Sequence, residues 1–350
     1  MSSATLGSSV ILFSISFLAS LFGVGLFTRW SRNRGLFDIP NERSSHSTPT
    51  PRGGGLIIVI VCLTGYVVVG FALGLPVSWG YLAGALIVSA VSWLDDLYSL
   101  PFWTRFLFHL LAAGILILDL GFLSQISLPA YPGQIVLGNV LGVIVTVAWL
   151  VWLLNAFNFM DGIDGIAALQ AVLSCIAWGV LASVLNLPST FLLSGVIASS
   201  SAGFLFHNWQ PAKVFMGDVG SAFLGFTLAA IPLLARREMQ GDFSVLIVGA
   251  VLFVWFFVFD TVFTFVRRLL ARKRVWQAHR EHIYQKLVIE GKAHSTVTLL
   301  YAIGSLFLSA TVLLALIFSG IFWLLALFSL LALTVLAAYY GVRKKVDVNT

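Results

Sequence analysis

The chain has 350 residues, of which 59% are hydrophobic and only 10% are charged, and its formal net charge is +6. Soluble domains carry about 25% charged residues, so this composition excludes an ordinary soluble protein. Repeated apolar runs of about 20 residues favour membrane-spanning helices over a β-barrel. The sequence therefore predicts an all-α, polytopic membrane protein with residues 1–350 in a single domain.

Eleven apolar runs are long enough to span a bilayer as helices. The first run has no basic segment before it, which predicts a retained helix rather than a cleaved signal peptide. Cys62 and Cys175 lie in two of the runs, so we expect two free, buried thiols. The predicted spans are residues 9–28, 55–74, 78–95, 103–121, 136–155, 166–185, 190–207, 219–235, 243–266, 297–318 and 320–340.

The basic residues predict the orientation of these spans. If the N-terminus lies outside, every Lys and Arg except Arg236 and Arg237 falls on the inner side, from Arg29 and Arg43 to Arg343, Lys344 and Lys345. This is the asymmetry of the positive-inside rule, and one span more or fewer would destroy it. The main inner loops are then residues 29–54, 96–102, 156–165, 208–218 and 267–296.

A polar loop, residues 41–55, joins the first two predicted spans. Its prolines favour extended backbone. The glycines at 53–55 open the second span with backbone N–H groups that can hold an anion, and His46 and Arg52 can add side-chain contacts. A flexible linker is the alternative interpretation.

Asp95 and Asp96 end the third predicted span. Adjacent helical side chains point about 100° apart, so one carboxylate can face a metal ion while the other acts as a base. Acids that merely cap a helix end are the alternative. Arg105, at the start of the next span, fits a phosphate ligand and a topology anchor equally well.

Two amides and two carboxylates follow an uncharged run at intervals of three residues: Asn155, Asn158, Asp161 and Asp164. Three such steps turn about half-way round a helix, so one straight helix cannot aim all four at one point. Glycines after both aspartates allow the backbone to leave helical geometry. The pattern predicts a helix that breaks into a polar loop, with a solvated C-cap as the alternative.

The segment before the eighth span places Asp218 between glycines, where backbone can approach a ligand closely. Phe215 offers a ring on which a base can stack. The predicted topology puts five aspartates at inner span ends, opposite the basic loops. Carboxylates for a divalent ion among phosphate-binding cations suit an anionic substrate bridged by metal; the five are Asp95, Asp96, Asp161, Asp164 and Asp218.

The inner loop 267–296 is basic and half apolar, so it can lie on an anionic membrane surface. His279 and His282 are three residues apart and would share a helix face. They can bind phosphate, bind metal or do neither. Asp260, inside the ninth span, is expected to face the bundle interior.

These motifs together resemble the polyprenyl-phosphate N-acetylhexosamine-1-phosphate transferases, the WecA/MraY-like glycosyltransferase family 4. The resemblance runs from about Arg43 to Lys286, and five motifs follow the family's order. They are His46-x-x-Pro49-x-Pro51-Arg52-x-Gly54-Gly55, Asp95-Asp96, Asn155-x-x-Asn158-x-x-Asp161-Gly-x-Asp164-Gly, Pro211-Ala-Lys-Val-Phe-Met-Gly-Asp218-x-Gly-Ser221 and His279-Arg-Glu-His282.

The resemblance implies transfer of a sugar 1-phosphate from a UDP-N-acetylhexosamine to undecaprenyl phosphate, with release of UMP, in the bacterial inner membrane. It implies Mg²⁺, with Mn²⁺ as an alternative. Membrane lipids are expected partners, nucleic acid is not, and a homodimer stays open.

The resemblance also implies roles for individual residues. Asp218 and Asp96 are expected at the metal, and the expected catalytic residues are Asp95, Asp96, Asp161 and Asp164. The expected substrate-binding residues are His46, Arg52, Arg105, Asn155, Asn158, Asn208, Lys213, Phe215, His279, Arg280 and His282.

Two departures bear on the sugar. Residues 97–99 offer neither an acid nor a lysine after the Asp pair, and the histidine motif continues as Ile283-Tyr284-Gln285 rather than with two more histidines. This form is similar to the branch that starts O-antigen from 6-deoxy sugars. We therefore expect UDP-N-acetylfucosamine or a related donor, with UDP-N-acetylglucosamine as the alternative. A transporter or lipid flippase is a remote alternative, because its acids should lie at mid-membrane with repeat symmetry.

Overall fold

The structure is a computed structural model that describes residues 3–40, 46, 48–127, 134–239, 243–274, 279–318 and 321–342. Within these residues, ten helices are long and apolar enough to cross a membrane, which confirms the predicted polytopic helical bundle. They are α1 (Ser3–Arg34), α2 (Gly55–Leu73), α3 (Trp79–Tyr98), α4 (Phe102–Leu120), α5 (Gly138–Met160), α6 (Ile166–Val184), α7 (Pro188–Asn208), α8 (Asp218–Glu238), α12 (His294–Phe318) and α13 (Ile321–Val342).

The ninth predicted span is broken into α9 (Ser244–Leu252) and α10 (Trp255–Leu270), which are bent by 68°. The break leaves the Phe253 carbonyl without a helical partner, and backbone polar groups in a membrane must be satisfied internally. Gln170 Nε2 and Ser174 Oγ of α6 donate hydrogen bonds to this carbonyl at 3.0 and 2.8 Å. The sequence predicted one span over residues 243–266 and indicated neither this break nor its long-range compensation.

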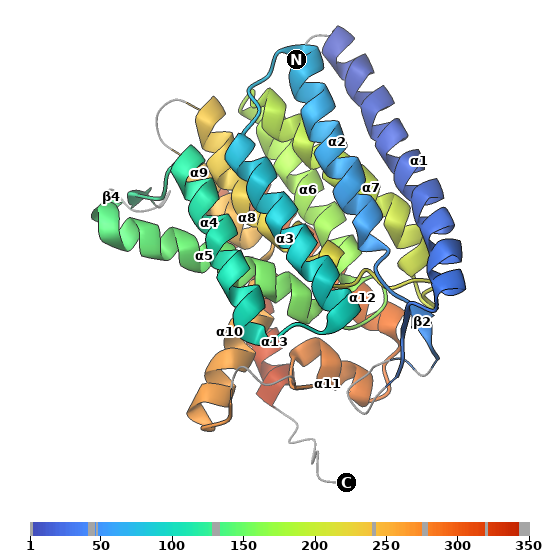
Figure 1. The fold of residues 1–350 in the computed structure, drawn as a ribbon. Coiled ribbons are helices and arrows are strands. Elements are labelled where there is room, and N and C mark those ends of the chain that lie inside the picture. The colour runs from blue at the N-terminus through green and yellow to red at the C-terminus, as the bar shows by residue number, and fades with distance from the viewer. Residues whose placement is uncertain are drawn as a thin grey trace.

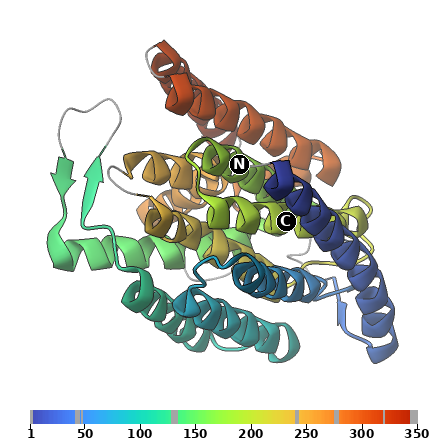
Figure 2. The ribbon, with the colours of Figure 1, turned by 90° about the horizontal axis from the view of Figure 1, so that it is seen from above.

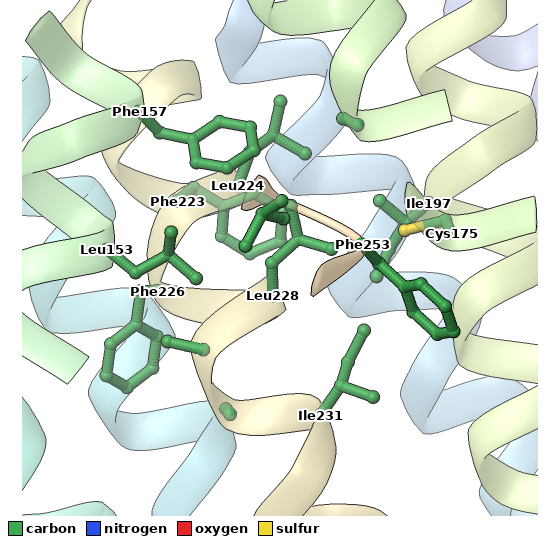
Figure 3. Close-up of a cluster of buried hydrophobic side chains, with 14 of the residues drawn as sticks. Leu153, Phe157, Cys175, Ile197, Phe223, Leu224, Phe226, Leu228, Ile231 and Phe253 are labelled. Atoms are coloured by element: carbon green, nitrogen blue, oxygen red, sulfur yellow. The ribbon is translucent and has the colours of Figure 1, made fainter. Parts of the chain in front are cut away.

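Helix α8 forms the centre of the bundle. It contacts α2, α3, α5 and α7, and almost all of its residues are buried. Figure 2 shows α12 and α13 on one flank, α3 and α4 on the opposite flank, and α8 between them. Figure 3 shows α8 side chains, from Phe223 to Ile231, packed among Leu153 and Phe157 of α5 and residues of α6 and α7.

The helical bundle also carries two antiparallel hairpins (Figure 1). In one, β1 (Phe37–Asp38) pairs with β2 (Thr50–Pro51) beside the short helix α11 (Ile283–Ile289). This pairing confirms the extended backbone predicted for that loop. In the other, β3 (Gln125–Ser127) pairs with β4 (Gln134–Val136).

One further sequence prediction can be compared with the structure, and another falls partly outside the described residues. Cys62 and Cys175 are free and buried, as expected. Four of the basic residues counted for the topology, Arg43, Arg343, Lys344 and Lys345, lie outside the described residues.

Candidate active site

A polar cavity of about 340 Å³ lies at the end of the bundle that carries the β1–β2 hairpin and α11. This volume is within the usual range for small-molecule sites. Eight of the residues predicted for the site line it: His46, Arg52, Asn158, Asp161, Asp164, Asn208, Phe215 and Asp218.

The acidic centre of the cavity is Asp218, the first residue of α8. Arg52 Nη2 donates to Asp218 Oδ1 at 2.8 Å and lies 2.7 Å from Asp96 Oδ1. Arg105 Nη1 lies 2.6 Å from Asp95 Oδ2 and 3.5 Å from Asp218 Oδ2. Three carboxylates from two helices therefore share two guanidinium groups.

Asp96 also organises the start of α8. Its two carboxylate oxygens accept the backbone N–H groups of Asp218 and Val219 at 2.9 and 3.1 Å. A helix N-terminus favours a carboxylate in this position. Gly217 has φ of +76°, and a Cβ there would lie 2.6 Å from Asp96 Oδ2, so glycine is required for this approach.

Gly54 and Gly55 do not provide the free anion-binding N–H groups that the sequence suggested for residues 53–55. Gly54 N–H donates to the Phe215 carbonyl at 3.0 Å, and Gly55 N–H donates to the Met216 carbonyl at 2.9 Å. In return, Phe215 N–H donates to the Pro51 carbonyl. These bonds fix the loop before α8 against the loop before α2, and Arg52 and Phe215 of these two loops line the cavity.

The broken end of α5 confirms the helix-to-loop prediction. The helix ends at Met160, with Asp161 as its C-cap. Asn158 Nδ2 donates to Ser221 Oγ at 3.2 Å, beside Asp218. Asp161 lines the cavity, and burial together with the nearby Asp218 and Asp96 charges raises its pKa well above the ordinary value.

A second polar cluster, around Asp164, lines another part of the cavity. Asp164 Oδ1 lies 3.3 Å from His294 Nδ1, and Asp164 Oδ2 accepts the Ala212 N–H at 3.1 Å. Asn208 Oδ1 accepts the Gly165 N–H at 2.9 Å, and its Nδ2 donates to the Val214 carbonyl. Asn208 and Asp164 thus hold the loops after α5 and α7 together.

Two side chains on the cavity wall suit a flat, anionic ligand. The Phe215 ring meets the His46 ring edge-on, with centroids 4.8 Å apart. Burial alone would lower the Arg52 pKa, but the Asp96 and Asp218 carboxylates raise it above its ordinary value. Arg52 is therefore a fixed positive charge in the same cavity as the half-buried Phe215 ring.

The structure does not bring all predicted residues to this cavity. Asn155 Nδ2 bonds back to the Val151 carbonyl of its own helix, and Lys213 is exposed, with Nζ 6.0 Å from the Phe206 ring centroid. His279, Arg280 and His282 do not line it either. Their proposed contacts with substrate stay predictions.

His282 and Asp260 form a buried pair instead. His282 Nδ1 lies 3.1 Å from Asp260 Oδ1. This confirms that Asp260 faces the bundle interior, where it is 1% exposed. Only the Nε2 atom of His282 remains for any ligand, because an aspartate partner occupies Nδ1.

Sequence reasoning missed two polar cavity residues, Asp38 and His294, whereas a third, Gln285, belongs to the segment that was expected to bear on the sugar. His294 begins α12, so its position at an inner span end, shared with the five aspartates, was the available signal. Gln285 belongs to the altered histidine motif, whose Tyr284 is fully buried. Asp38 had no signal in the sequence alone.

Among the residues that the structure describes, no group of three or more His, Cys, Asp or Glu side chains is placed to hold a metal ion. Mg²⁺ sites commonly use one or two carboxylates together with water and substrate phosphates. The Asp96–Asp218 pair fits such a partial site, because the three neighbouring carboxylates exceed the two guanidinium groups that neutralise them.

Comparison with known proteins gives a consistent result. The model of a protein family described as glycosyl transferase family 4 matches residues 78–236. A probable undecaprenyl-phosphate N-acetylglucosaminyl 1-phosphate transferase of Bacillus subtilis is 32% identical over 307 residues, which cover 87% of this chain and 84% of that protein.

Two other relatives are named for related transfer reactions. A decaprenyl-phosphate N-acetylglucosaminephosphotransferase of Mycobacterium leprae is 31% identical over 75% of this chain and 72% of its own length. A phospho-N-acetylmuramoyl-pentapeptide-transferase of Streptococcus pyogenes is 31% identical over 68% of this chain and 74% of its own length.

Proposed function

This chain belongs to glycosyl transferase family 4, and we propose that it transfers an N-acetylhexosamine 1-phosphate from a UDP-sugar to undecaprenyl phosphate, releasing UMP. The site of action is the inner face of the bacterial cytoplasmic membrane. The named activities of the relatives support this reaction class.

One observation carries the proposal: the carboxylate cluster around Asp218 is under-neutralised and opens into a cavity. Among the residues that the structure describes, Asp95, Asp96 and Asp218 form ion pairs with two cations, Arg52 and Arg105. Such a cluster attracts a divalent cation, while guanidinium groups bind phosphate oxygens with charge-assisted hydrogen bonds. Both features serve a reaction between two phosphate groups.

Asp218, with help from Asp96, is the proposed Mg²⁺ ligand. The Asp218 carboxylate is paired with Arg52 and Arg105, and Asn158 stands beside it. A bound cation would replace the arginines at this carboxylate and free them for phosphate. When bound, Mg²⁺ supplies charge neutralisation on the diphosphate.

The chain's own residues then position the two reactants. Arg52 and Arg105 lower the repulsion between the diphosphate and the lipid phosphate, and positioning supplies much of the remaining rate. Asp95 and Asp96 have oxygens that already accept backbone N–H groups. Asp161, whose carboxylate lines the cavity near Asp218, is the group that we assign to accept the proton of the lipid phosphate.

We assign the nucleotide to the part of the cavity that Phe215, Asp164 and Asn208 line. Phe215 offers a ring face to the uracil, and Asp164 with Asn208 holds the loops around it. Stacking on an aromatic ring is worth about 1–3 kcal/mol per base.

N-acetylglucosamine is the proposed sugar, because two of the relatives carry it in their names. The 6-deoxy alternative rests on the altered histidine motif. Only Gln285 of that motif lines the cavity, while Tyr284 is turned inward. The N-acetylfucosamine alternative is therefore supported by one cavity residue of this motif, Gln285.

Purified protein given undecaprenyl phosphate, Mg²⁺ and equal amounts of UDP-N-acetylglucosamine and UDP-N-acetylfucosamine tests the proposal. We expect UMP release and a lipid product that carries mainly N-acetylglucosamine. A mainly N-acetylfucosamine product would reverse the sugar assignment but keep the reaction class. No UMP release with either donor would contradict the reaction and favour a transporter.

A further inference from the structure

The buried carboxylate of Asp260 fixes the start of α11 to the core. Asp260 Oδ1 accepts the Ile283 N–H at 2.9 Å and the His282 Nδ1–H at 3.1 Å, and Asp260 Oδ2 accepts the Tyr284 N–H at 3.3 Å. Tyr301 of α12 donates its hydroxyl to Asp260 Oδ2 at 2.7 Å. One acid of α10 thereby fixes three consecutive residues of the loop.

Tyr284 connects this anchored segment to the end of α5. Its side chain is fully buried, and its hydroxyl donates to the Phe159 carbonyl at 2.8 Å. Phe159 lies in the last turn of α5, where carbonyl groups lack an intrahelical partner. The tyrosine hydroxyl supplies the missing donor immediately before Asp161.

Gly162 shows how close this contact is. A Cβ at Gly162 would lie 2.2 Å from the Tyr284 hydroxyl oxygen and 3.1 Å from its ring carbon Cζ. The clash is mainly with the hydroxyl, so it depends on the same atom that holds Phe159. Tyr284 therefore contacts the chain on both sides of Asp161, which lines the cavity.

We propose that Tyr284, held by Asp260, is a positioning residue that sets the direction of Asp161 in the active site. This deepens the proposed transferase function and rests on it. Tyr284 of the altered histidine motif thus acts on Asp161 through the end of α5, rather than through direct contact with the sugar. A misplacement of about 1 Å in a catalytic group can cost about a hundredfold in rate.

Two phenylalanine substitutions separate positioning from simple stabilisation. Tyr284→Phe removes the donor to Phe159, whereas Tyr301→Phe removes a bond of similar length to Asp260 in the same buried network, and Tyr301 does not line the cavity. We expect Tyr284→Phe to lower kcat about tenfold with KM for the UDP-sugar nearly unchanged. Tyr301→Phe should keep kcat within about twofold, and both should lower the melting temperature in detergent.

A rescue experiment tests the geometry directly. Gly162→Ala should almost abolish turnover, because its new methyl group meets the Tyr284 hydroxyl. The Gly162→Ala/Tyr284→Phe double variant should be several-fold more active than Gly162→Ala alone, since the obstructing oxygen is gone. Independent effects would instead make the double variant the least active of the three.

The outcomes distinguish this inference from the proposed function. If wild-type protein releases UMP but Tyr284→Phe and Tyr301→Phe have equal kcat values, or the double variant shows no rescue, Tyr284 does not position Asp161. If wild-type protein releases no UMP with either donor, the transferase proposal itself fails.

Discussion

Two acidic centres in this molecule differ in how their charges are satisfied. Asp260 is a single carboxylate, 1% exposed, that accepts hydrogen bonds from backbone N–H groups, a histidine and a tyrosine. The Asp218 centre holds three carboxylates against two arginines, and the Asp218 side chain is 22% exposed. Both lie near the same end of the bundle, but only the second opens into the cavity.

The difference separates structural acids from functional ones. A buried acid whose oxygens are all occupied stabilises the fold, and removing it leaves donors unpaired. Acids that repel one another around too few cations weaken the fold but prepare a place for a ligand. Four predictions test this difference between the two centres.

The largest effect is expected at Asp218. Asp218→Asn removes the proposed metal ligand, so turnover should fall by about a thousandfold, a loss of several kcal/mol in transition-state stabilisation. The melting temperature should stay the same or rise, because one of three like charges is removed. UMP release and thermal melting in detergent measure the two effects.

Asp119→Asn is the matched control for that experiment. Asp119 is paired with Ser78, Gly80 and Arg237 outside the cavity, so its substitution should leave turnover unchanged. Equal losses in the two variants would show that the activity depends on general stability rather than on the acidic cluster.

Asp260→Ala should produce the opposite pattern. The substitution leaves buried donors unpaired, at about 1–3 kcal/mol each, so the melting temperature should drop by several degrees. Residual turnover at low temperature should remain well above that of Asp218→Asn. A melting temperature equal to that of the wild type would contradict the structural role of Asp260.

A smaller effect is expected at His294. His294→Ala removes the partner of Asp164 on the nucleotide side, so KM for the UDP-sugar should rise about tenfold while kcat changes little. His207→Ala, which removes an imidazole bonded to the Leu21 carbonyl outside the cavity, is the control. A fall in kcat at constant KM would show that His294 acts in catalysis rather than in substrate binding.

The smallest effect concerns pH. Burial, His282 and Arg268 lower the pKa of His279 to about 4, below the ordinary value of 6.5. The unfolded chain therefore binds a proton that the folded chain does not, and stability should fall as the pH drops from about 7 towards 4. His279→Gln should lose about 2 °C less than wild type between pH 7 and pH 5; an identical pH response would contradict the lowered pKa.

The sequence predicted the helical bundle and much of the site for physical reasons that can be named. Apolar runs defined the spans, and the spacing from Asn155 to Asp164 indicated a broken helix, as observed. Asp95, Asp96 and Asp218 were expected together because all three end or begin spans on the same side. Their shared arginines confirm that grouping.

The remaining features depend on contacts that no local pattern contains. The break between α9 and α10 is compensated by Gln170 of α6, far away in the chain. His282 pairs with Asp260 of α10, and the Lys213 side chain lies near the Phe206 ring. Such choices are made by tertiary packing, so spacing alone could not distinguish them from substrate contacts.

The most direct test of the account is the metal dependence of UMP release. Purified wild-type protein, stripped with EDTA, is given undecaprenyl phosphate, UDP-N-acetylglucosamine and increasing Mg²⁺, in parallel with Asp218→Asn. We expect UMP release by the wild type to saturate with Mg²⁺ and to stop without a divalent ion. The variant should release almost no UMP at ordinary Mg²⁺. Release that persists in excess EDTA, or an unchanged Mg²⁺ response in Asp218→Asn, would contradict the claim that the under-neutralised cluster is the catalytic centre.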